Sequence, residues 1–551
     1  MKNKPDLLEH IIHGIFLILG LITVGCVLVI TIYLVISGIP AIREIGLVDF
    51  SVMSSRNRVL KQVRETYGKS RAILDMTETF SSAKKLSARD VHDIIRAASM
   101  ARVETVVLPQ NVAYKEDLNA ISEGQIVPWV WAEGELSGKT DALWLLLSGA
   151  RGIISDNTAL LSETAATSLV QNTLTTAPLN VGHRGTYASI SGAPENTVEN
   201  AIVAYENGAN AVEVDIFMTK DGVIVLHHDS GTGKKMKAPD GSSSNWSIEN
   251  NSYEFLSSLY YTGYYEKDEN GEDVEYTGYH ISTLEALLDE FKDKDLRFVI
   301  EIKSSKSEIV PALKALIDRY DVLDQCMVIT FPSTGQLDDL MTYFPELAVG
   351  SLLGTSSSAS DPEQALYYTL KDSQPTNAIP DLNYSGYGAG YVRAATMRGI
   401  PVMGWTINDT AKIYRALLDG LTGITTDNAH VLGALAKSIT AKTPYQTVPG
   451  SSVTVDAEVV SYAREALEGE IELIVIEGEE LVASADGLTL QLVEGAEGVV
   501  TYMVSYTQTL STGESYTIYT QPQWFFVSEE TLEEPEEPET SDVSYVIITG
   551  N

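Results

Sequence analysis

The sequence predicts a TIM (β/α)8 barrel as its central domain, with a transmembrane helix and a βα half-barrel before it and a small β-sandwich after it. Two observations predict the barrel. Short apolar, β-branched runs end in polar clusters and are followed by a turn or a helical pattern, and eight such runs occur in order. Most gaps between the runs can hold a helix. The runs end at His183, Asp215, Lys303, Phe331, Leu353, Asn383, Thr406 and Asp427.

A membrane anchor is expected in residues 1–40. Residues 14–36 form an apolar run without a charge, and at ~1.5 Å per residue this run spans about 35 Å, enough to cross a bilayer. The run is too long for a signal-peptide core, and no Ala-x-Ala-like site follows it, so we expect an uncleaved helix. Two lysines before it favour a cytoplasmic N-terminus, although arginines after it weaken that count. The expected location is therefore the cell membrane, single-pass, with the later domains extracellular.

Residues 41–175 predict a half-barrel that repeats the last four βα units of the barrel. Trp131 corresponds to Trp405, and the pair Asp156-Asn157 corresponds to Asp427-Asn428. The strands that would carry catalytic residues have no counterpart, so we expect a non-catalytic unit. The predicted strands are 72–76, 105–109, 127–131 and 152–157, and the predicted helices are 88–99, 115–123 and 140–148.

Such a half-barrel leaves open sheet edges and an apolar face that must be covered. Docking on the barrel of the same chain is one solution. Pairing with a second copy is the other, and it would make a homodimer about a two-fold axis. Pairing between copies is favoured because the central barrel already has eight strands of its own.

The two C-terminal segments differ in composition. Residues 443–528 contain alternating or apolar runs separated by turn residues, which predicts a β-sandwich accessory domain. Residues 529–551 begin with a like-charged run punctuated by proline, which is typical of a disordered acidic tail.

Charge and cysteine content exclude several classes of protein. The net charge of -37 argues against nucleic-acid binding and against tight docking on anionic headgroups, because phosphates would be repelled. The two cysteines cannot form a disulfide framework, since Cys26 lies in the apolar run and Cys326 in a predicted buried strand.

The residue types at the predicted rim suit a metal-assisted phosphoryl reaction. Glu213 and Asp215 are two apart on one strand, so both carboxylates face the same side and can bind Mg²⁺ or Ca²⁺. His183 and His228 follow the flanking strands, and two imidazoles can act as base and acid across one phosphorus atom. Arg184 can bind phosphate oxygens.

These residues lie in motifs that resemble the glycerophosphodiester phosphodiesterase family over about residues 179–437, within a predicted barrel domain of residues 176–440. The upstream motifs are His-Arg-Gly at 183–185, Pro-Glu-Asn-Thr at 194–197, Glu-x-Asp at 213–215 and His-Asp at 228–229. Matching segments follow in the expected order at 281–288, 299–303, 404–408 and 423–427. The resemblance is specific because so many short motifs recur in one order.

The resemblance implies metal-dependent hydrolysis of glycerophosphodiesters to sn-glycerol 3-phosphate and an alcohol. It implies His183 and His228 as the acid and base, with Glu213, Asp215 and Glu301 as ligands of a divalent cation. His227 must face the other side of its strand, and the family's His-Asp pair selects His228. The remaining assignments are phosphate contacts by Arg184 and Lys303 and an apolar wall from Trp405, which is equally typical of a barrel core.

The family also places an insertion at residues 230–280, over the active-site mouth. Its tyrosines can contact a polyol headgroup or form a self-packed surface loop. Two other functions remain open from the sequence. One is a phospholipase-type enzyme acting on lysophospholipids or glycerol-phosphate polymers at the cell surface, and the other is a non-catalytic surface binding protein.

Overall fold

The computed structural model describes residues 51–66, 71–186, 192–267, 272–354, 361–372 and 378–532. Within these ranges no helix has the length and apolar character needed to cross a membrane. The predicted anchor at residues 14–36 and residues 533–551 of the predicted acidic tail lie outside the described residues.

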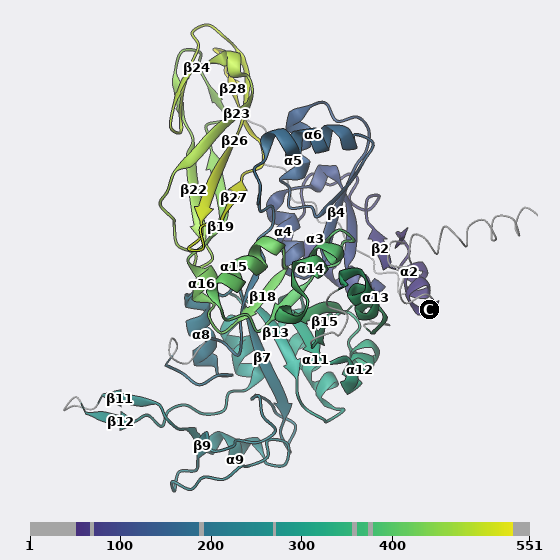
Figure 1. The fold of residues 1–551 in the computed structure, drawn as a ribbon, viewed down its shortest axis with the longest axis vertical. Coiled ribbons are helices and arrows are strands. Elements are labelled where there is room, and N and C mark those ends of the chain that lie inside the picture. The colour runs from purple at the N-terminus through teal and green to yellow at the C-terminus, as the bar shows by residue number, and fades with distance from the viewer. Residues whose placement is uncertain are drawn as a thin grey trace, which may run out of the picture.

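The first unit is an open parallel sheet with strands in sequence order and helices between them (Figure 1). All four predicted strands and all three predicted helices are present, and the unit contains an additional first strand. Ser87 begins one helix with a capping box, in which its side chain accepts from the Asp90 N–H. The elements are β1 (Ser51–Ser54), α2 (Asn57–Thr66), β2 (Arg71–Asp75), α3 (Ala88–Ala101), β3 (Thr105–Pro109), α4 (Lys115–Glu123), β4 (Val127–Ala132), α5 (Lys139–Leu146), β5 (Gly152–Ser155) and α6 (Thr158–Ser168).

The central domain is a closed barrel of eight parallel strands, as the sequence predicts. Closure comes from the pairing of β13 with β7, in which Glu301 lies opposite Asp215. The strands are β6 (Leu179–Gly182), β7 (Ala211–Met218), β13 (Arg297–Ile302), β14 (Cys326–Thr330), β15 (Ala348–Leu353), β16 (Ile379–Asn383), β17 (Met403–Trp405) and β18 (Gly423–Thr426). The barrel interior is apolar, with a cluster that includes Leu179, Val299, Met327 and Met403.

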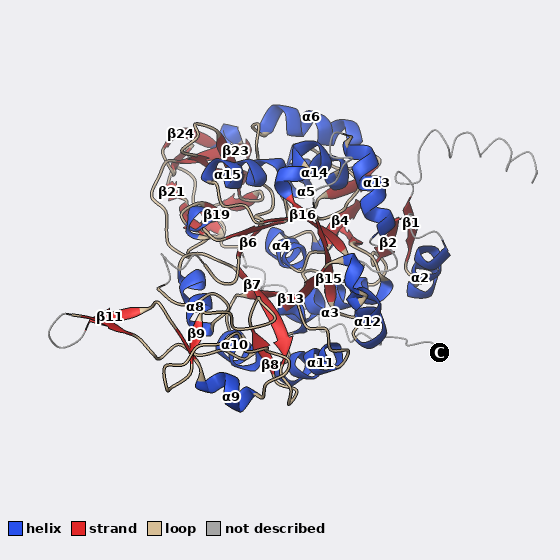
Figure 2. Ribbon diagram, turned by 60° about the horizontal axis from the view of Figure 1, so that its bottom comes forward, coloured by secondary structure: helices blue, strands red, loops and turns tan. Residues whose placement is uncertain are grey.

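Helices surround the barrel on the outside (Figure 2). Their apolar faces pack against the outward side chains of the strands in two large clusters. The helices are α8 (Val198–Glu206), α10 (Leu284–Phe291), α11 (Ile309–Tyr320), α12 (Gln336–Tyr343), α13 (Pro362–Asp372), α14 (Gly388–Thr396), α15 (Thr410–Asp419) and α16 (His430–Gly433).

The strand before His228 is not a barrel strand. It is β8 (Ile224–Leu226), which pairs antiparallel with the end of β7. After it, the segment of residues 230–280 projects from the barrel as an arm (Figure 2). Its residues Met236, Ile248 and Leu256 share an apolar cluster with Phe217 of β7 and Val225 of β8. The arm contains β9 (Met236–Lys237), α9 (Tyr253–Ser258), β10 (Tyr260–Tyr261), β11 (Tyr265–Lys267) and β12 (Asp273–Glu275).

The C-terminal region consists of β-strands in small sheets that are almost entirely antiparallel. The first strand is β19 (Ala436–Lys442), and one apolar cluster joins barrel residues such as Ile413 to residues of these sheets such as Tyr516. This region therefore shares a core with the barrel. Its other strands are β20 (Gln446–Thr447), β21 (Ser452–Thr454), β22 (Asp456–Ser461), β23 (Ile471–Glu477), β24 (Val482–Asp486), β25 (Thr489–Leu492), β26 (Gly498–Thr509), β27 (Ser515–Tyr519) and β28 (Gln523–Val527).

The half-barrel docks on the N-terminal end of the barrel in the same chain. The Thr422 hydroxyl before β18 donates to Gln125 Oε1 at 2.7 Å, and the Thr105 hydroxyl donates to the Gly399 carbonyl at 2.7 Å. Leu143 of the half-barrel shares an apolar cluster with Met503 of the C-terminal sheets. These contacts show that the half-barrel docks on the barrel of the same chain, which is the first of the two arrangements considered. The homodimer that the sequence favoured is not supported. Residues before β4 and at the start of β3 thus lie against residues before β18 and β17 of the barrel.

Candidate active site

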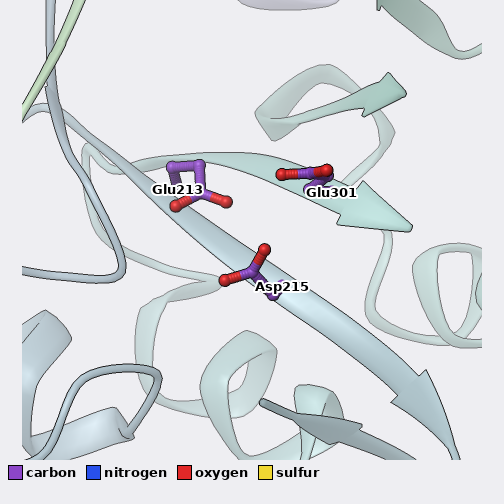
Figure 3. A group of neighbouring side chains, drawn as sticks. All are labelled: Glu213, Asp215 and Glu301. Atoms are coloured by element: carbon purple, nitrogen blue, oxygen red, sulfur yellow. The ribbon is translucent and has the colours of Figure 1, made fainter. Parts of the chain in front are cut away.

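Three carboxylates from two adjacent strands meet inside the C-terminal end of the barrel (Figure 3). Glu213 and Asp215 lie on β7 and Glu301 on β13, and one oxygen from each lies within 4.8 Å of the others. Glu213 and Asp215 are buried. Burial and the charges of Asp215 and Glu301 raise the pKa of Glu213 well above its usual value. The structure thus brings together the three residues that the resemblance implies as metal ligands.

This cluster has the donor set of a divalent-cation site. Carboxylate oxygens are hard ligands of the kind that Ca²⁺ and Mg²⁺ prefer. Glu213 Oε1 is buried and has no hydrogen-bond partner among the described residues. Like charges at this spacing destabilise one another unless protons or a cation compensate them. The residues present therefore fit a divalent cation, although the geometry does not distinguish calcium from magnesium.

A tight turn after β6 brings backbone and side-chain groups onto the carboxylates. Arg184 has a positive φ of 52°, and its N–H donates to Glu213 Oε2 at 3.0 Å. A Cβ on the following Gly185 would lie 2.2 Å from Asn200 Oδ1, so only glycine fits there. Asn196 holds Asp215 from both sides, accepting from its N–H and donating to its carboxylate at 2.9 Å each. The sequence analysis had no role for this asparagine, although it lies within the Pro-Glu-Asn-Thr motif.

Two cations flank the cluster. Arg184 Nε lies 3.3 Å from Asp215 Oδ2, and Lys303 Nζ lies 2.6 Å from Glu301 Oε1 and 3.4 Å from Asp215 Oδ1. Burial acts to lower the pKa of Lys303, but Asp215 and Glu301 raise it overall. Both side chains thus place positive charge directly beside the carboxylates.

His183 is oriented by a carboxylate on the neighbouring strand. Its Nδ1 lies 2.7 Å from Oδ1 of Asp427, which follows β18, and its Nε2 lies 3.9 Å from Glu213 Oε2. Burial acts to raise the pKa of Asp427, but its hydrogen bonds with His183 and Asn408 lower it overall. A neutral imidazole that donates Nδ1–H to Asp427 has an unprotonated Nε2 on the cavity side.

His228 and His227 have different surroundings, as the sequence predicts. His228 lines the same cavity as Glu213 and Glu301, and its Nδ1 lies 2.9 Å from Asp229 Oδ1. His227 is buried, its Nδ1 contacts the Asp229 carbonyl, and burial lowers its pKa. Only His228 of this pair faces the carboxylates.

The central cavity has about 250 Å³ and two chemically different sides. His183, Arg184, His228, Lys303, Glu213 and Glu301 form the charged side. The other side is largely apolar, and Trp405 lies there with its ring centroid 6.2 Å from that of Phe331. The remaining residues of this side are Ile329, Leu352, Asp381, Thr406 and Thr425.

Asp381 on β16 is a residue that the sequence analysis missed. Its side chain is 1% exposed, and neither carboxylate oxygen has a hydrogen-bond partner among the described residues. Burial, with a contribution from Glu301, raises its pKa well above the usual value. Aspartate is rarely fully buried, but within this short apolar run it resembles the polar residue that ends a strand, so the sequence alone did not single it out.

A second cavity of about 320 Å³ adjoins the first and shares His183 and Arg184 with it. Tyr261 and Tyr264 of the arm line it, together with Lys235. The arm therefore has both features that the sequence left open, since it packs on itself and also borders the site.

Residues 183–431 match the model of the Glycerophosphoryl diester phosphodiesterase family. The match supports the family predicted for the barrel. The chain is 26% identical over 263 residues to a glycerophosphodiester phosphodiesterase of Caldanaerobacter subterraneus, covering 46% of this chain and 96% of that protein. It is 27% identical over 261 residues to one from Bacillus subtilis, covering 45% and 83%. The family and both relatives are named for an enzyme, so the prediction of an enzyme is confirmed.

Similar solved structures also cover the barrel. One is a glycerophosphodiester phosphodiesterase from Thermotoga maritima, with 24% identity and a TM-score of 0.34 over 46% of this chain and 96% of that one. Another is an Oleispira antarctica phosphodiesterase in complex with the product sn-glycerol-3-phosphate, with 20% identity and a TM-score of 0.36 over 46% and 94%.

Proposed function

We propose that the barrel hydrolyses glycerophosphodiesters to sn-glycerol 3-phosphate and an alcohol. The observation that carries this proposal is one cavity lined by His183, His228, Glu213 and Glu301. Asp215 belongs to the same carboxylate cluster, and Arg184 and Lys303 lie beside it. The names of the matching family and of the relatives support the same reaction.

Glu213, Asp215 and Glu301 would hold a divalent cation, Ca²⁺ or Mg²⁺. When bound, such a cation polarises a phosphate oxygen and lowers the pKa of a nearby hydroxyl or water. Asn196 fixes the Asp215 carboxylate, and the Arg184 N–H fixes that of Glu213, so the ligand oxygens are held in place before the cation arrives.

The two histidines would exchange protons with the substrate. Asp427 holds the Nδ1 proton of His183, and Asp229 is placed to do the same for His228, which leaves each Nε2 free for the reaction. One histidine takes the proton of the attacking hydroxyl, and the other donates a proton to the leaving alkoxide oxygen. Arg184 and Lys303 offset the negative charge of the phosphate, and Trp405 bounds the space for the glycerol carbons.

The decisive experiment is a product assay on a panel of diesters. Purified protein stripped of metal is given glycerophosphodiesters, lysophospholipids or a glycerol-phosphate polymer, with and without Ca²⁺ or Mg²⁺. We expect cation-dependent release of sn-glycerol 3-phosphate from the glycerophosphodiesters. No turnover of any diester with either cation would refute the proposal.

A phospholipase-type activity on lysophospholipids is the second candidate. The observation that favours it is Phe331, which is 37% exposed beside Trp405 on the apolar side of the cavity. An apolar surface there can hold part of an acyl chain. Faster turnover of lysophospholipids than of deacylated diesters in the same panel would support this reading.

We also propose that the enzyme is anchored in the cell membrane with its catalytic domain outside the cell. Support comes from the uncharged apolar run at residues 14–36, the lysines before it and the acidity of the rest of the chain. Protease added to intact cells should release an active fragment. A domain that resists protease until the cells are lysed would show the opposite orientation.

A further inference from the structure

Two buried polar groups without partners lie on the apolar side of the central cavity. Asp381 lies on β16, and neither of its carboxylate oxygens has a hydrogen-bond partner among the described residues. Thr425 lies on β18, and its hydroxyl also has no partner among them. Both residues are at least 98% buried, and both line the cavity that contains His183 and His228. The strand between them, β17, carries Trp405.

The surroundings of Asp381 give it no structural role that the described residues reveal. Leu352 and Met403 are its register partners on the two neighbouring strands, and both are buried apolar residues. A buried carboxyl without a hydrogen bond destabilises a fold, and a ligand in the cavity that Asp381 lines can complete its bonds. Asp381 also lies outside the cluster of Glu213, Asp215 and Glu301 that fits a cation.

Trp405 is fixed relative to these groups. Its indole N–H donates to the backbone carbonyl of Asp381 at 3.0 Å, which ties the ring to β16. The cavity therefore offers hydrogen-bonding groups on both strands that flank an aromatic side chain. A short polyol has the same pattern, with hydroxyls carried on a carbon chain.

We propose that Asp381 and Thr425 bind the free hydroxyls of the substrate's glycerol moiety, with Trp405 against its carbon atoms. This inference rests on the proposed function and adds a substrate preference to it. Because the carboxyl and the hydroxyl lose their partners when a substrate hydroxyl is missing or acylated, the site selects glycerol esters with free hydroxyls. Lysophospholipids, which carry an acyl group on one of these oxygens, are selected against.

The test compares two substrates that differ by one hydroxyl. One is the ethanolamine diester of sn-glycerol 3-phosphate, and the other is its analogue built on propane-1,2-diol, which lacks the terminal hydroxyl but keeps the hydroxyl next to the phosphate ester. We expect the unmodified enzyme to prefer the glycerol diester by at least about tenfold in kcat/KM. Asp381→Leu should reduce this preference to within about threefold, mainly by slowing the glycerol diester. Calorimetry with sn-glycerol 3-phosphate should show a matching loss of affinity.

Ser351→Ala is the matched control. Ser351 lies on the neighbouring strand β15, is equally buried, and has a hydroxyl without a partner among the described residues, but it does not line the cavity. This variant should keep the full preference. Asp381→Asn should have an unchanged or higher Tm without ligand, because it replaces a buried acid by a neutral group.

The outcomes separate the two proposals. An enzyme that hydrolyses neither diester refutes the proposed function. An active enzyme without the preference, or an Asp381→Leu variant that keeps it, refutes the inference alone. A fall in Tm of more than about 5 °C in both Asp381 variants would also refute it, since the carboxyl would then support the fold rather than a ligand.

Discussion

At the residue scale, the two histidines and the carboxylates make separable contributions. Neither imidazole belongs to the carboxylate cluster, and His183 Nε2 lies 3.9 Å from the nearest oxygen of Glu213. His183→Ala or His228→Ala should therefore lower kcat by about 10²–10⁴-fold while cation binding measured by calorimetry stays nearly unchanged. His227→Gln is the control, because His227 is buried outside the cavity and its loss should lower Tm more than kcat. Loss of cation binding in the first two variants would contradict the assignment.

The raised pKa of Glu213 leads to a dependence on pH. A carboxyl whose pKa is raised by folding weakens the fold as pH rises from the usual carboxyl range through the raised value. A cation bound by the ionised cluster removes this effect, so Ca²⁺ or Mg²⁺ should raise Tm by about 3–8 °C at pH 8 and by much less at pH 5. Differential scanning calorimetry at both pH values measures the shift.

Glu213→Gln serves as the control for this experiment. The amide keeps an acceptor for the Arg184 N–H but removes one charge from the cluster. Without cation this variant should be more stable than the unmodified protein at pH 8. Addition of cation should raise its Tm much less than it raises that of the unmodified protein. An equal shift at pH 5 and pH 8 in the unmodified protein would contradict the prediction.

At the element scale, the arm is connected to Arg184, for which we propose a phosphate contact. Lys235 of the arm donates to Glu195 at 3.0 Å, and Glu195 pairs with Arg184 at 3.3 Å. The cavity between these residues and Tyr264 lies beside His183, where the leaving alcohol of a diester would extend. Tyr264→Ala should raise KM by about 2–10-fold, and the size of the increase should depend on the leaving alcohol of the diester.

Tyr265→Ala is matched to this variant by position. Tyr265 is the next residue, is 66% exposed and does not line either cavity beside His183. Steady-state kinetics on diesters of ethanolamine, choline and glycerol should show an unchanged KM for this control. Equal behaviour of the two variants would mean that the arm does not contact the substrate.

The elements themselves could largely be predicted from the sequence, for a physical reason. Parallel barrel strands are buried on both sides, so each appears as an apolar run, and a polar residue such as His183 or Asp427 comes directly after its carboxyl end. Neither β1 nor Asp381 could be found this way. The run at β1 is only four residues long, and Asp381 lies inside its strand, where a polar residue resembles an early strand end. The convergence of Asp381 with Thr425 depends on strand curvature and closure, which spacing does not encode.

At the scale of the whole molecule, Glu123 connects the three units of the chain. It ends α4 of the half-barrel and lies 3.5 Å from Arg297 of β13 and 3.1 Å from Lys437 of β19. Burial acts to raise the pKa of Glu123, but Lys437 and Arg297 lower it overall. The sequence analysis could not find this contact, because nothing in the spacing of these residues relates them.

Replacing this carboxylate should loosen the docking of the half-barrel. Glu123→Gln leaves two partly buried cations without their shared partner, so we expect a loss of about 1–3 kcal/mol in the free energy of unfolding at pH 7. A lowered pKa gives stability that is present above the usual carboxyl pKa and is lost as pH falls through the lowered value. The difference in Tm between the variant and the unmodified protein should therefore shrink below about pH 4. Calorimetry across pH 3–7 measures it.

Glu116→Gln distinguishes docking from a general effect of charge. Glu116 lies on the same helix and pairs with Lys85 within the half-barrel, where it is mostly exposed, so its loss should change the free energy of unfolding by less than about 1 kcal/mol. The Glu123 variant should also expose the half-barrel to limited proteolysis between α6 and β6, whereas the Glu116 variant should not. If the two variants have the same Tm and the same cleavage pattern at pH 7, the ion pairs of Glu123 do not hold the half-barrel in place, and the apolar contacts of Leu143 and Leu147 with the C-terminal sheets must account for the docking.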